Sequence, residues 1–278
     1  MKLHMKRYLY CLLAVLCMAG CAQDPYVIVQ VADAQLGFTA ADVSQTNGTE
    51  YVNDLSFEVG CLTKAVAQIN QIKPDAVVFT GDQVHRSWDQ EQWDTFAQII
   101  SGLDESITVL HVPGNHDVVL SDNGVDSTPF TSRYGDDRFC RLENGVRIVG
   151  INTNLIKYGD TLETCQKDWL KEVLKKESPD EVTLVFGHHP FFTTDIAEDE
   201  GYFQMSQEKR REYFDLFAQE GVNAVYAGHH HSTHAGEYKG VPMKTLTAVG
   251  VQLGPDKSAF RVITVENGAV SDEIVELK

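Results

Sequence analysis

The chain has 278 residues and a formal net charge of −17 at pH 7, with 40 acidic against 23 basic side chains. Its overall electrostatic field would repel nucleic acid, which excludes nonspecific nucleic-acid binding as its general function. An anionic substrate would need local attraction, from a bound cation or from a few basic side chains. The length is sufficient for one large α/β domain with a substantial core.

The first twenty residues have the features of an export signal. Lys2, Lys6 and Arg7 precede an apolar run, 9–18, that is too short to span a bilayer as a helix. We therefore expect residues 1–20 to be a signal peptide. Its removal takes away three basic residues and no acidic residue, which changes the net charge from −17 to −20.

The end of this signal, Met18-Ala19-Gly20-Cys21, resembles the lipobox of bacterial lipoproteins, in which the cysteine becomes lipidated and N-terminal. The resemblance implies an exported envelope protein, anchored to a membrane through lipid on Cys21 and facing the periplasm or the cell surface. Residues 21–278 would form the mature domain. The alternatives are an ordinary cleaved signal and an uncleaved anchor.

Three cysteines follow Cys21, namely Cys61, Cys140 and Cys165. Their odd number and unpaired spacing predict no disulfide framework. None has the Cys-x-x-Cys spacing of a structural zinc site.

The first half of the chain alternates buried strands with amphipathic helices. Strands are predicted at 26–31, 75–80 and 107–112, with helices at 57–72 and 89–103 between them. In the first helix, Leu62, Val66 and Ile69 fall on one face. A polar loop is expected from 38 to 54.

The second half is less regular. Segment 118–136 is polar and predicts a surface excursion, and Asn144-Gly145 predicts a hairpin. Segment 191–207 is acidic and aromatic without a period, which is typical of a lid or substrate loop. The remaining predictions are helices at 165–176 and 207–219 and strands at 181–186, 222–227, 236–238, 243–248, 260–265 and 274–277. This order predicts one domain whose parallel inner strands are continued by antiparallel outer strands.

Five predicted strands end in polar side chains. These are Asp33 and Gln35, Asp82 and His85, Asn115 and His116, His188, and His229 and His231. Because the carboxyl ends of parallel strands form the ligand-binding edge of an α/β sheet, we expect them at one rim. Oxygen and imidazole ligands suit manganese, iron or zinc better than calcium. The ligands outnumber what one ion needs, which favours two ions that share a carboxylate.

The motifs Asp33-x-Gln35, Gly81-Asp82-x-x-His85, Gly114-Asn115-His116-Asp117, Gly187-His188-x-Pro190 and Gly228-His229-x-His231 together resemble the calcineurin-like metallophosphoesterase superfamily. The match spans residues 33–231 in the family's order. It implies a two-sheet β-sandwich flanked by helices, in four αββα layers. It also implies hydrolysis of a small phosphate ester at a dinuclear metal centre.

The resemblance also implies a role for each matching residue. Asp33 and His231 would hold the first ion, and Asp82 would bridge both ions. The second site would be completed by Asn115, His188 and His229. His116 would protonate the leaving oxygen, and a hydroxide bridging the ions would be the nucleophile.

Two positions depart from the commonest family pattern. Gln35 replaces a histidine, which resembles a branch with Asp-x-Gln in its first motif and favours phosphomonoesters over diesters. His85 stands where the family often has Asn, and Gln35 and His85 are both candidates for contact with phosphate or with a metal ion, the first ion in the case of His85. The alternatives are a phosphodiesterase acting on cyclic-nucleotide or nucleotide-type substrates, and a non-catalytic metal- or phosphate-binding lipoprotein.

Each of these residues also has a purely structural interpretation. Asp33 and Asp82 could cap helices, Asn115 could be a turn residue, and His116 could make a structural hydrogen bond. Asp117 is expected to support the loop geometry or to orient His116, and not to touch substrate. Two further groups fall outside the motifs: His189, His230 and His234, and the aromatic residues Phe191, Phe192, Tyr202 and Phe203. The aromatic residues could line the substrate site or simply pack in the core.

Overall fold

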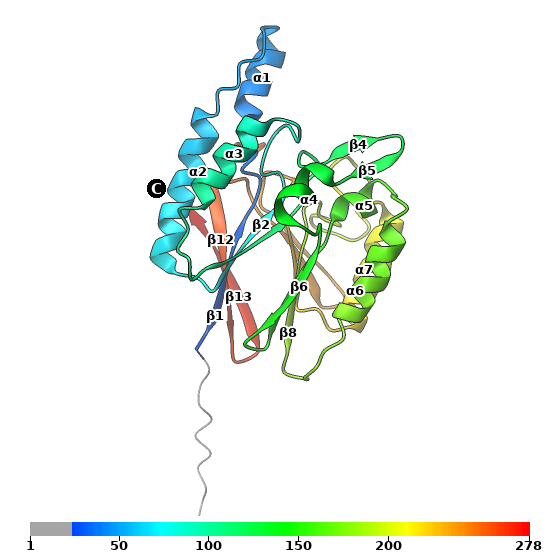
Figure 1. Ribbon diagram of the computed structural model, residues 1–278. Coiled ribbons are helices and arrows are strands. Elements are labelled where there is room, and N and C mark those ends of the chain that lie inside the picture. The colour runs from blue at the N-terminus through cyan, green and yellow to red at the C-terminus, as the bar shows by residue number, and fades with distance from the viewer. Residues whose placement is uncertain (1–23) are drawn as a thin grey trace, which may run out of the picture.

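The computed structural model describes residues 24–278, so the predicted signal peptide and Cys21 lie outside the described residues. Two β-sheets pack face to face, and helices cover the outer face of each sheet (Figure 1). The predicted αββα architecture is confirmed. Between residues 24 and 278, no helix is both long enough and apolar enough to cross a membrane.

The first sheet places three parallel strands beside an antiparallel hairpin. In order across the sheet, its strands are β13 (Ala269–Glu276), β12 (Ala259–Glu266), β1 (Tyr26–Val31), β2 (Ala76–Thr80) and β3 (Thr108–Val112). Helices α2 (Ser56–Ile72) and α3 (Gln90–Ile100) bury their apolar faces against it. In α2, Leu62, Val66 and Ile69 point inward, as their spacing predicts.

The second sheet has four parallel strands between antiparallel edge strands. Its order is β10 (Ala235–Tyr238), β11 (Val241–Thr245), β9 (Ala224–Ala227), β8 (Val182–Phe186), β7 (Val146–Gly150) and β6 (Phe139–Glu143). Helices α6 (Glu163–Val173) and α7 (Gln207–Gln219) cover its outer face. Strands β6 and β7 form the predicted hairpin around Asn144 and Gly145.

The interface between the sheets has an apolar core and is also crossed by several hydrogen bonds. Ile28, Leu184 and Phe186 are fully buried there, and burial of each such side chain contributes about 1.5–3 kcal/mol. Nε2 of Gln30 donates to the Ala227 carbonyl across the interface, at 3.0 Å. This bond fixes the ends of β1 and β9, which are the strands that lead to Asp33 and His229.

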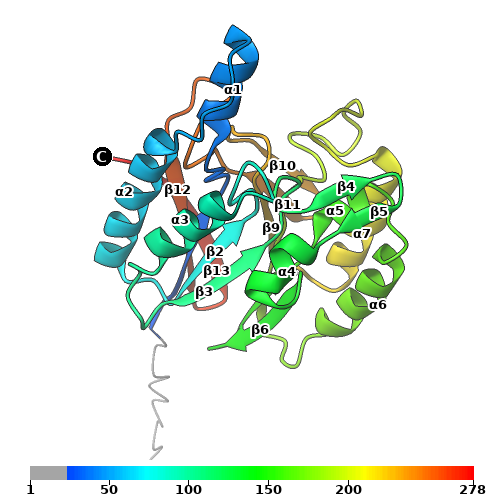
Figure 2. The same cartoon turned by 45° about the horizontal axis from the view of Figure 1, so that its top comes forward.

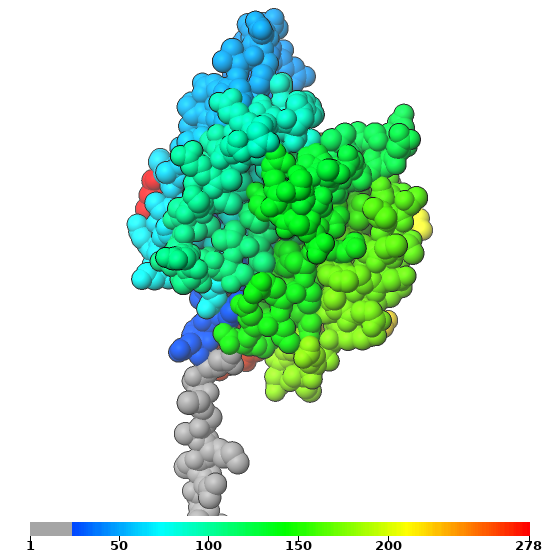
Figure 3. Space-filling view, in the orientation of Figure 1, coloured from blue at the N-terminus to red at the C-terminus, as the bar shows by residue number. Residues whose placement is uncertain are grey.

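Two predicted loops contain regular structure. Residues 38–54 hold helix α1 (Phe38–Asn47), which stands out from the rounded body in Figures 2 and 3. Only Ala40 of this helix is buried, so the sequence contains no apolar stripe that would reveal it. The excursion 118–136 holds the hairpin β4–β5 (Val119–Ser121, Gly124–Asp126) and helix α4 (Thr128–Tyr134).

A short helix between β7 and α6 was also missed. This is α5 (Thr153–Lys157), whose five residues are too few to show a helical period. It follows β7 directly, with Asn152 as its N-cap.

Candidate metal centre

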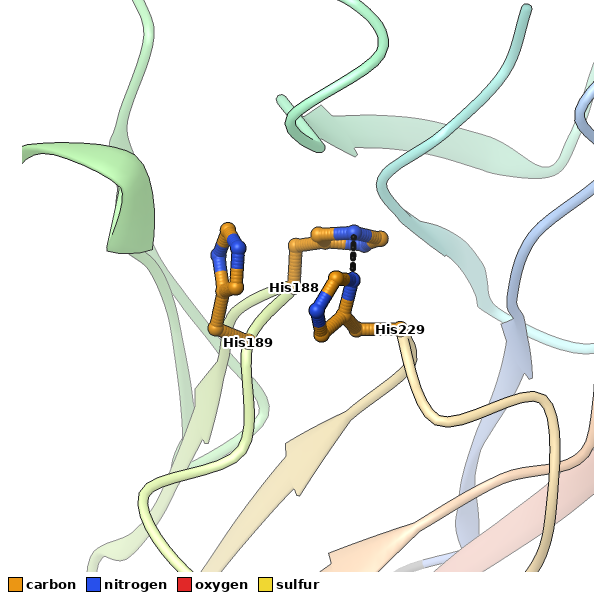
Figure 4. Close-up of side chains that lie close together, drawn as sticks. All are labelled: His188, His189 and His229. Atoms are coloured by element: carbon orange, nitrogen blue, oxygen red, sulfur yellow. Dashed lines mark hydrogen bonds between the residues drawn. The ribbon is translucent and has the colours of Figure 1, made fainter. Parts of the chain in front are cut away.

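The predicted polar side chains gather at the carboxyl ends of β1, β2, β3, β8 and β9. The first three of these strands belong to one sheet and the other two to the second sheet, so the site forms where the sheets meet. Among the candidate ligands, Asp33, Asp82, His188, His229 and His231 are buried, and Asn115 is partly buried. The ring of His188 lies against that of His229 in Figure 4.

Unusual backbone geometry directs these side chains inward. Asp33, Asp82, His229 and His231 have positive φ values of 53°, 49°, 67° and 52°, and Gln35 has 41°. These are five of the nine non-glycine residues with positive φ between residues 24 and 278. Such conformations are costly and cluster at functional sites, where the surrounding structure enforces them.

Two glycines allow the turns to pack against the ligands. A Cβ on Gly114 would lie 2.0 Å from Oδ1 of Asp82, and one on Gly228 would lie 2.6 Å from Oδ2 of Asp33. Both distances are shorter than any van der Waals contact. The close backbone approach at these turns therefore requires glycine.

His188 presents a lone pair to the centre of the cluster. Its Nδ1 lies 2.9 Å from the Thr80 carbonyl, which can only accept, so Nδ1 is the protonated nitrogen of the neutral ring. Its Nε2 lies 3.1 Å from Oδ1 of Asn115, 3.1 Å from Nδ1 of His229 and 3.3 Å from Oδ2 of Asp82. When the His188 ring is neutral, four acceptor atoms thus share one small space without a proton between them.

The electrostatics of this space favour a cation. Burial lowers the pKa of His188, but the carboxylates of Asp82 and Asp33 outweigh burial and raise it to about 9. Burial raises the pKa of Asp82, but the charges of His188 and His116 lower it by more, so the net shift of this pKa is downward. The carboxylates therefore stabilise positive charge at this point, so the residues fit a metal ion.

His231 and Asp33 form the other half of the cluster. Nδ1 of His231 bonds to the Val251 carbonyl, which leaves Nε2 as a lone pair 3.5 Å from Oδ1 of Asp33. Asp33 also accepts the backbone N–H of His229 at 3.0 Å. Ligand atoms of Asp33, Asp82 and His188 lie within 4.8 Å of one another, close enough to surround an ion.

His116 lies at the edge of this cluster. Its backbone N–H donates to Oδ1 of Asp82 at 2.8 Å, and its Nδ1 lies 2.9 Å from the His85 carbonyl. Because that carbonyl can only accept, Nε2 is the nitrogen of His116 that can exchange a proton with a ligand. The ring stacks on His85 at 4.7 Å.

Gln35 and His85 contact each other beside the first half of the site. Nε2 of Gln35 lies 3.4 Å from Nδ1 of His85, and Oε1 of Gln35 is buried without a hydrogen-bond partner. Burial and the neighbouring His116 lower the pKa of His85 to about 4, so the ring is neutral at pH 7. A buried amide oxygen without a partner is an acceptor that a cation would satisfy.

Asp117 supports the loop, as predicted. Its Oδ1 accepts the N–H groups of Gln83 and Val84 at 2.9 and 3.2 Å, and its Oδ2 accepts that of Gly114 at 2.8 Å. The side chain is fully buried. It therefore ties the turn after β2 to the turn after β3.

The histidines outside the motifs have separate surroundings. His230 and His234 both hydrogen-bond to the hydroxyl of Ser232. His189 is buried beside His229 (Figure 4), and ligand atoms of His188, His189 and His229 also lie within 4.8 Å of one another. His189 is thus a further residue that the geometry allows as a ligand, although Nδ1 lies 3.2 Å from the Thr153 hydroxyl.

Helix α5 connects two turns of the site, and the sequence analysis missed both residues involved. The hydroxyl oxygen of Thr153 accepts the N–H groups of His188 and His189 at 3.2 and 2.9 Å. Nδ2 of Asn154 donates to the carbonyls of Pro113 and Gly114. The sequence feature that could have revealed them is the polar triplet 152–154 after β7, because it lies at a strand end as the other motifs do.

Comparisons with known proteins agree with this arrangement. The family model described as calcineurin-like phosphoesterase matches residues 26–233. The serine/threonine-protein phosphatase CPPED1 of Mus musculus is 30% identical over 254 residues, which cover 87% of this chain and 81% of that protein. A dimetal phosphatase from Danio rerio superposes with a TM-score of 0.58 at 18% identity, over 91% of this chain and 99% of that one. A purple acid phosphatase from yellow lupin seeds gives a TM-score of 0.70 at 14% identity, over 91% of this chain and 51% of that one.

The packing of Gly114 against Asp82 yields a prediction. We expect Gly114→Ala to displace the Asp82 carboxylate and to weaken metal binding about 10- to 100-fold, as loss of ligand support typically does. Metal titration followed by elemental analysis measures this loss. Gly60→Ala is the control, because nothing lies within 4 Å of a Cβ at that position in α2. Full metal binding by the Gly114 variant would contradict the prediction.

Proposed function

The chain belongs to the calcineurin-like phosphoesterase family and is a metallophosphoesterase, and we propose that it hydrolyses phosphomonoesters at a centre of two metal ions. The observation that supports this most strongly is the crowding of acceptor atoms around Nε2 of His188. Such a cluster is unfavourable unless cations neutralise it.

We assign the ligands to two groups. Asp33 and His231 would hold the first ion, and Asn115, His188 and His229 would hold the second. Asp82 would contact both, since ligand atoms of Asp82, Asp33 and His188 all lie within 4.8 Å of one another. His189 is left outside this set because it lies outside the five motifs; its Nε2 is buried without a hydrogen-bond partner, so the geometry alone does not exclude it.

The nitrogen and oxygen donors suit manganese, iron or zinc, and no thiol lies among them. Bound there, two such cations would lower the pKa of a water molecule and offset the negative charge of the phosphoryl group. The role of the protein is to hold the ligands in place before substrate arrives. The hydrogen bonds of Thr80, Val251 and Thr153 to the histidines do this.

His116 is assigned as the proton donor to the leaving oxygen. Its Nδ1 is fixed by the His85 carbonyl, so a proton on Nε2 faces away from that bond and is free to be transferred. The bond from its backbone to Asp82 sets its distance from the ligands. His116 can therefore act next to the ions without being a ligand.

The preference for monoesters is supported by Gln35. An amide oxygen donates less electron density than imidazole, so a first ion beside Gln35 would keep more positive charge for a dianionic phosphate. The similarity to a serine/threonine-protein phosphatase over 87% of the chain agrees with this preference. A phosphodiesterase is the second candidate, and the neutral His85 beside Gln35 would suit its monoanionic substrate.

We also propose that the protein is an exported bacterial lipoprotein attached to the membrane through Cys21. The support is the sequence of residues 1–21 and the position of Tyr26, where the folded domain begins only five residues later. The strand β1 starts at the end of the sheets opposite the metal centre (Figure 1). A lipid anchor there would leave the candidate site facing away from the membrane.

Removal of His116 tests the mechanism. We expect His116→Ala to lower kcat about 100-fold or more for an alkyl phosphate, whose leaving oxygen needs a proton. The loss should be much smaller for p-nitrophenyl phosphate, because nitrophenolate leaves without protonation. Bound metal should not change. Loss of both ions from this variant would show that His116 is a ligand, and equal losses for both esters would argue against its role as an acid.

Replacement of Gln35 tests the ester preference. The manganese-, iron- or zinc-loaded protein should hydrolyse p-nitrophenyl phosphate faster than bis-p-nitrophenyl phosphate. Gln35→His should tighten the first metal site and shift this ratio toward the diester. Gln98→His, on the exposed side of α3, is the matched control. Unchanged metal affinity in the Gln35 variant would place this residue outside the ligand shell.

Replacement of Cys21 tests the anchor. Cys21→Ser should convert a membrane-bound, detergent-extracted protein into one recovered in the aqueous fraction, with its metal content unchanged. Fractionation of cells expressing each form measures this. Recovery of the protein that keeps Cys21 in the aqueous fraction would contradict lipidation.

A further inference from the structure

The segment between β8 and α7 has no regular structure but is firmly held. Arg210 of α7 is fully buried and directs its guanidinium into this loop. It donates to four backbone carbonyls at distances from 2.6 to 3.3 Å. They belong to Ile196, Glu198, Asp199 and Met205. A buried charge that binds only backbone fixes the loop in one conformation.

The tip of the loop, residues 201–204, has a second anchor. Nζ of Lys157 in α5 donates to the carbonyls of Gly201, at 2.9 Å, and Gln204. Within residues 24–278, no carboxylate forms an ion pair with this lysine. Its charge is therefore used to hold the tip against α5.

The same helix α5 fixes the tip relative to the metal centre. Thr153 binds the turn of His188, Asn154 binds the turn of Asn115, and Lys157 binds the loop tip. All three contacts start from one helix of five residues. The tip is thus held beside the metal centre by the same helix that holds the turns of His188 and Asn115.

The four aromatic residues of this loop separate into two pairs. Phe191 and Phe192 are buried in the core of the second sheet. Tyr202 is 62% exposed, and its ring centroid lies 5.3 Å from that of His229. Phe203 lies 5.2 Å from Tyr202 and 5.5 Å from His229. A large ring is therefore held open to solvent beside a candidate ligand.

We propose that Tyr202, backed by Phe203, binds a planar ring in the leaving group of the substrate, and that Lys157 is the positioning residue for this contact. The substrates would be phosphomonoesters of aromatic alcohols, an inference that rests on the proposed function. Stacking or edge-to-face contact of two rings contributes about 0.5–1.5 kcal/mol beyond buried area. A fixed support makes this contact available without the entropy cost of ordering the loop.

Phenyl phosphate and cyclohexyl phosphate, which differ in the planarity of a six-membered ring, test the contact. Tyr202→Ala should raise KM for phenyl phosphate about five-fold and that for cyclohexyl phosphate less than two-fold. Tyr202→Phe should keep the preference. Phe57 is half exposed at the start of α2, so Phe57→Ala is the control for loss of an exposed ring. This variant should have the same KM values as the protein without a substitution.

Lys157→Met should abolish the preference for phenyl phosphate over cyclohexyl phosphate through a change in KM, while the metal content of the protein stays unchanged. Lys157→Arg should restore the preference. Lys171→Met, an exposed lysine of α6, is the matched control. Equal effects of Tyr202→Ala on both esters, or an intact preference in Lys157→Met, would overturn the inference while leaving the proposed function standing. Absence of turnover of both esters with manganese, iron and zinc would overturn the proposed function, and this inference with it.

Discussion

The concentration of buried acceptor atoms where the two sheets meet is the constraint on which the site depends. Two carboxylates and three imidazole rings are removed from water within a small volume, beside the partly buried amide of Asn115. The cost of burying such charge is several kcal/mol per ion unless opposite charge accompanies it. In the metal-free protein, Asp82 and Asp33 retain a proton on His188, which is the nearest substitute for a cation. Metal binding at this point would therefore stabilise the folded protein.

The rest of the architecture makes this concentration possible. Strands from both sheets end at one rim, and the bond from Gln30 to the Ala227 carbonyl fixes the two sheets near that rim. Positive φ values turn Asp33, Asp82 and His231 inward, and glycine at 114 lets the next turn pack on Asp82. Outside this rim, Asp117 and helix α5 tie the turns to one another. The ligand side chains are thus positioned by hydrogen bonds within the protein and not by contacts to substrate.

Much of this arrangement could be predicted from the sequence, because local patterns encode it. Short apolar runs followed by Gly and by Asp, Asn or His mark both the strands and the side chains at their ends. No such pattern predicts helix α1, because this helix buries only Ala40 and has no apolar face. Helix α5 is too short for periodicity, although Asn152, Thr153 and Asn154 lie at a strand end like the other motifs.

The loop between β8 and α7 shows a different limit of sequence reasoning. Its composition is typical of a lid or substrate loop, and it does not reveal that Arg210 and Lys157 hold the segment through its backbone carbonyls. Such bonds depend on the tertiary position of one side chain and leave no pattern in the loop itself. The division of its aromatic residues between the core and the site is set in the same way.

Crystals of the full protein grown with manganese, measured by anomalous diffraction, would test the two-ion centre most directly. Two peaks are expected, one on each side of Asp82. The first would contact Asp33 and His231, and the second would contact Asn115, His188 and His229. A single peak enclosed by His188, His189 and His229 would contradict the two-ion centre, as would no peak at all.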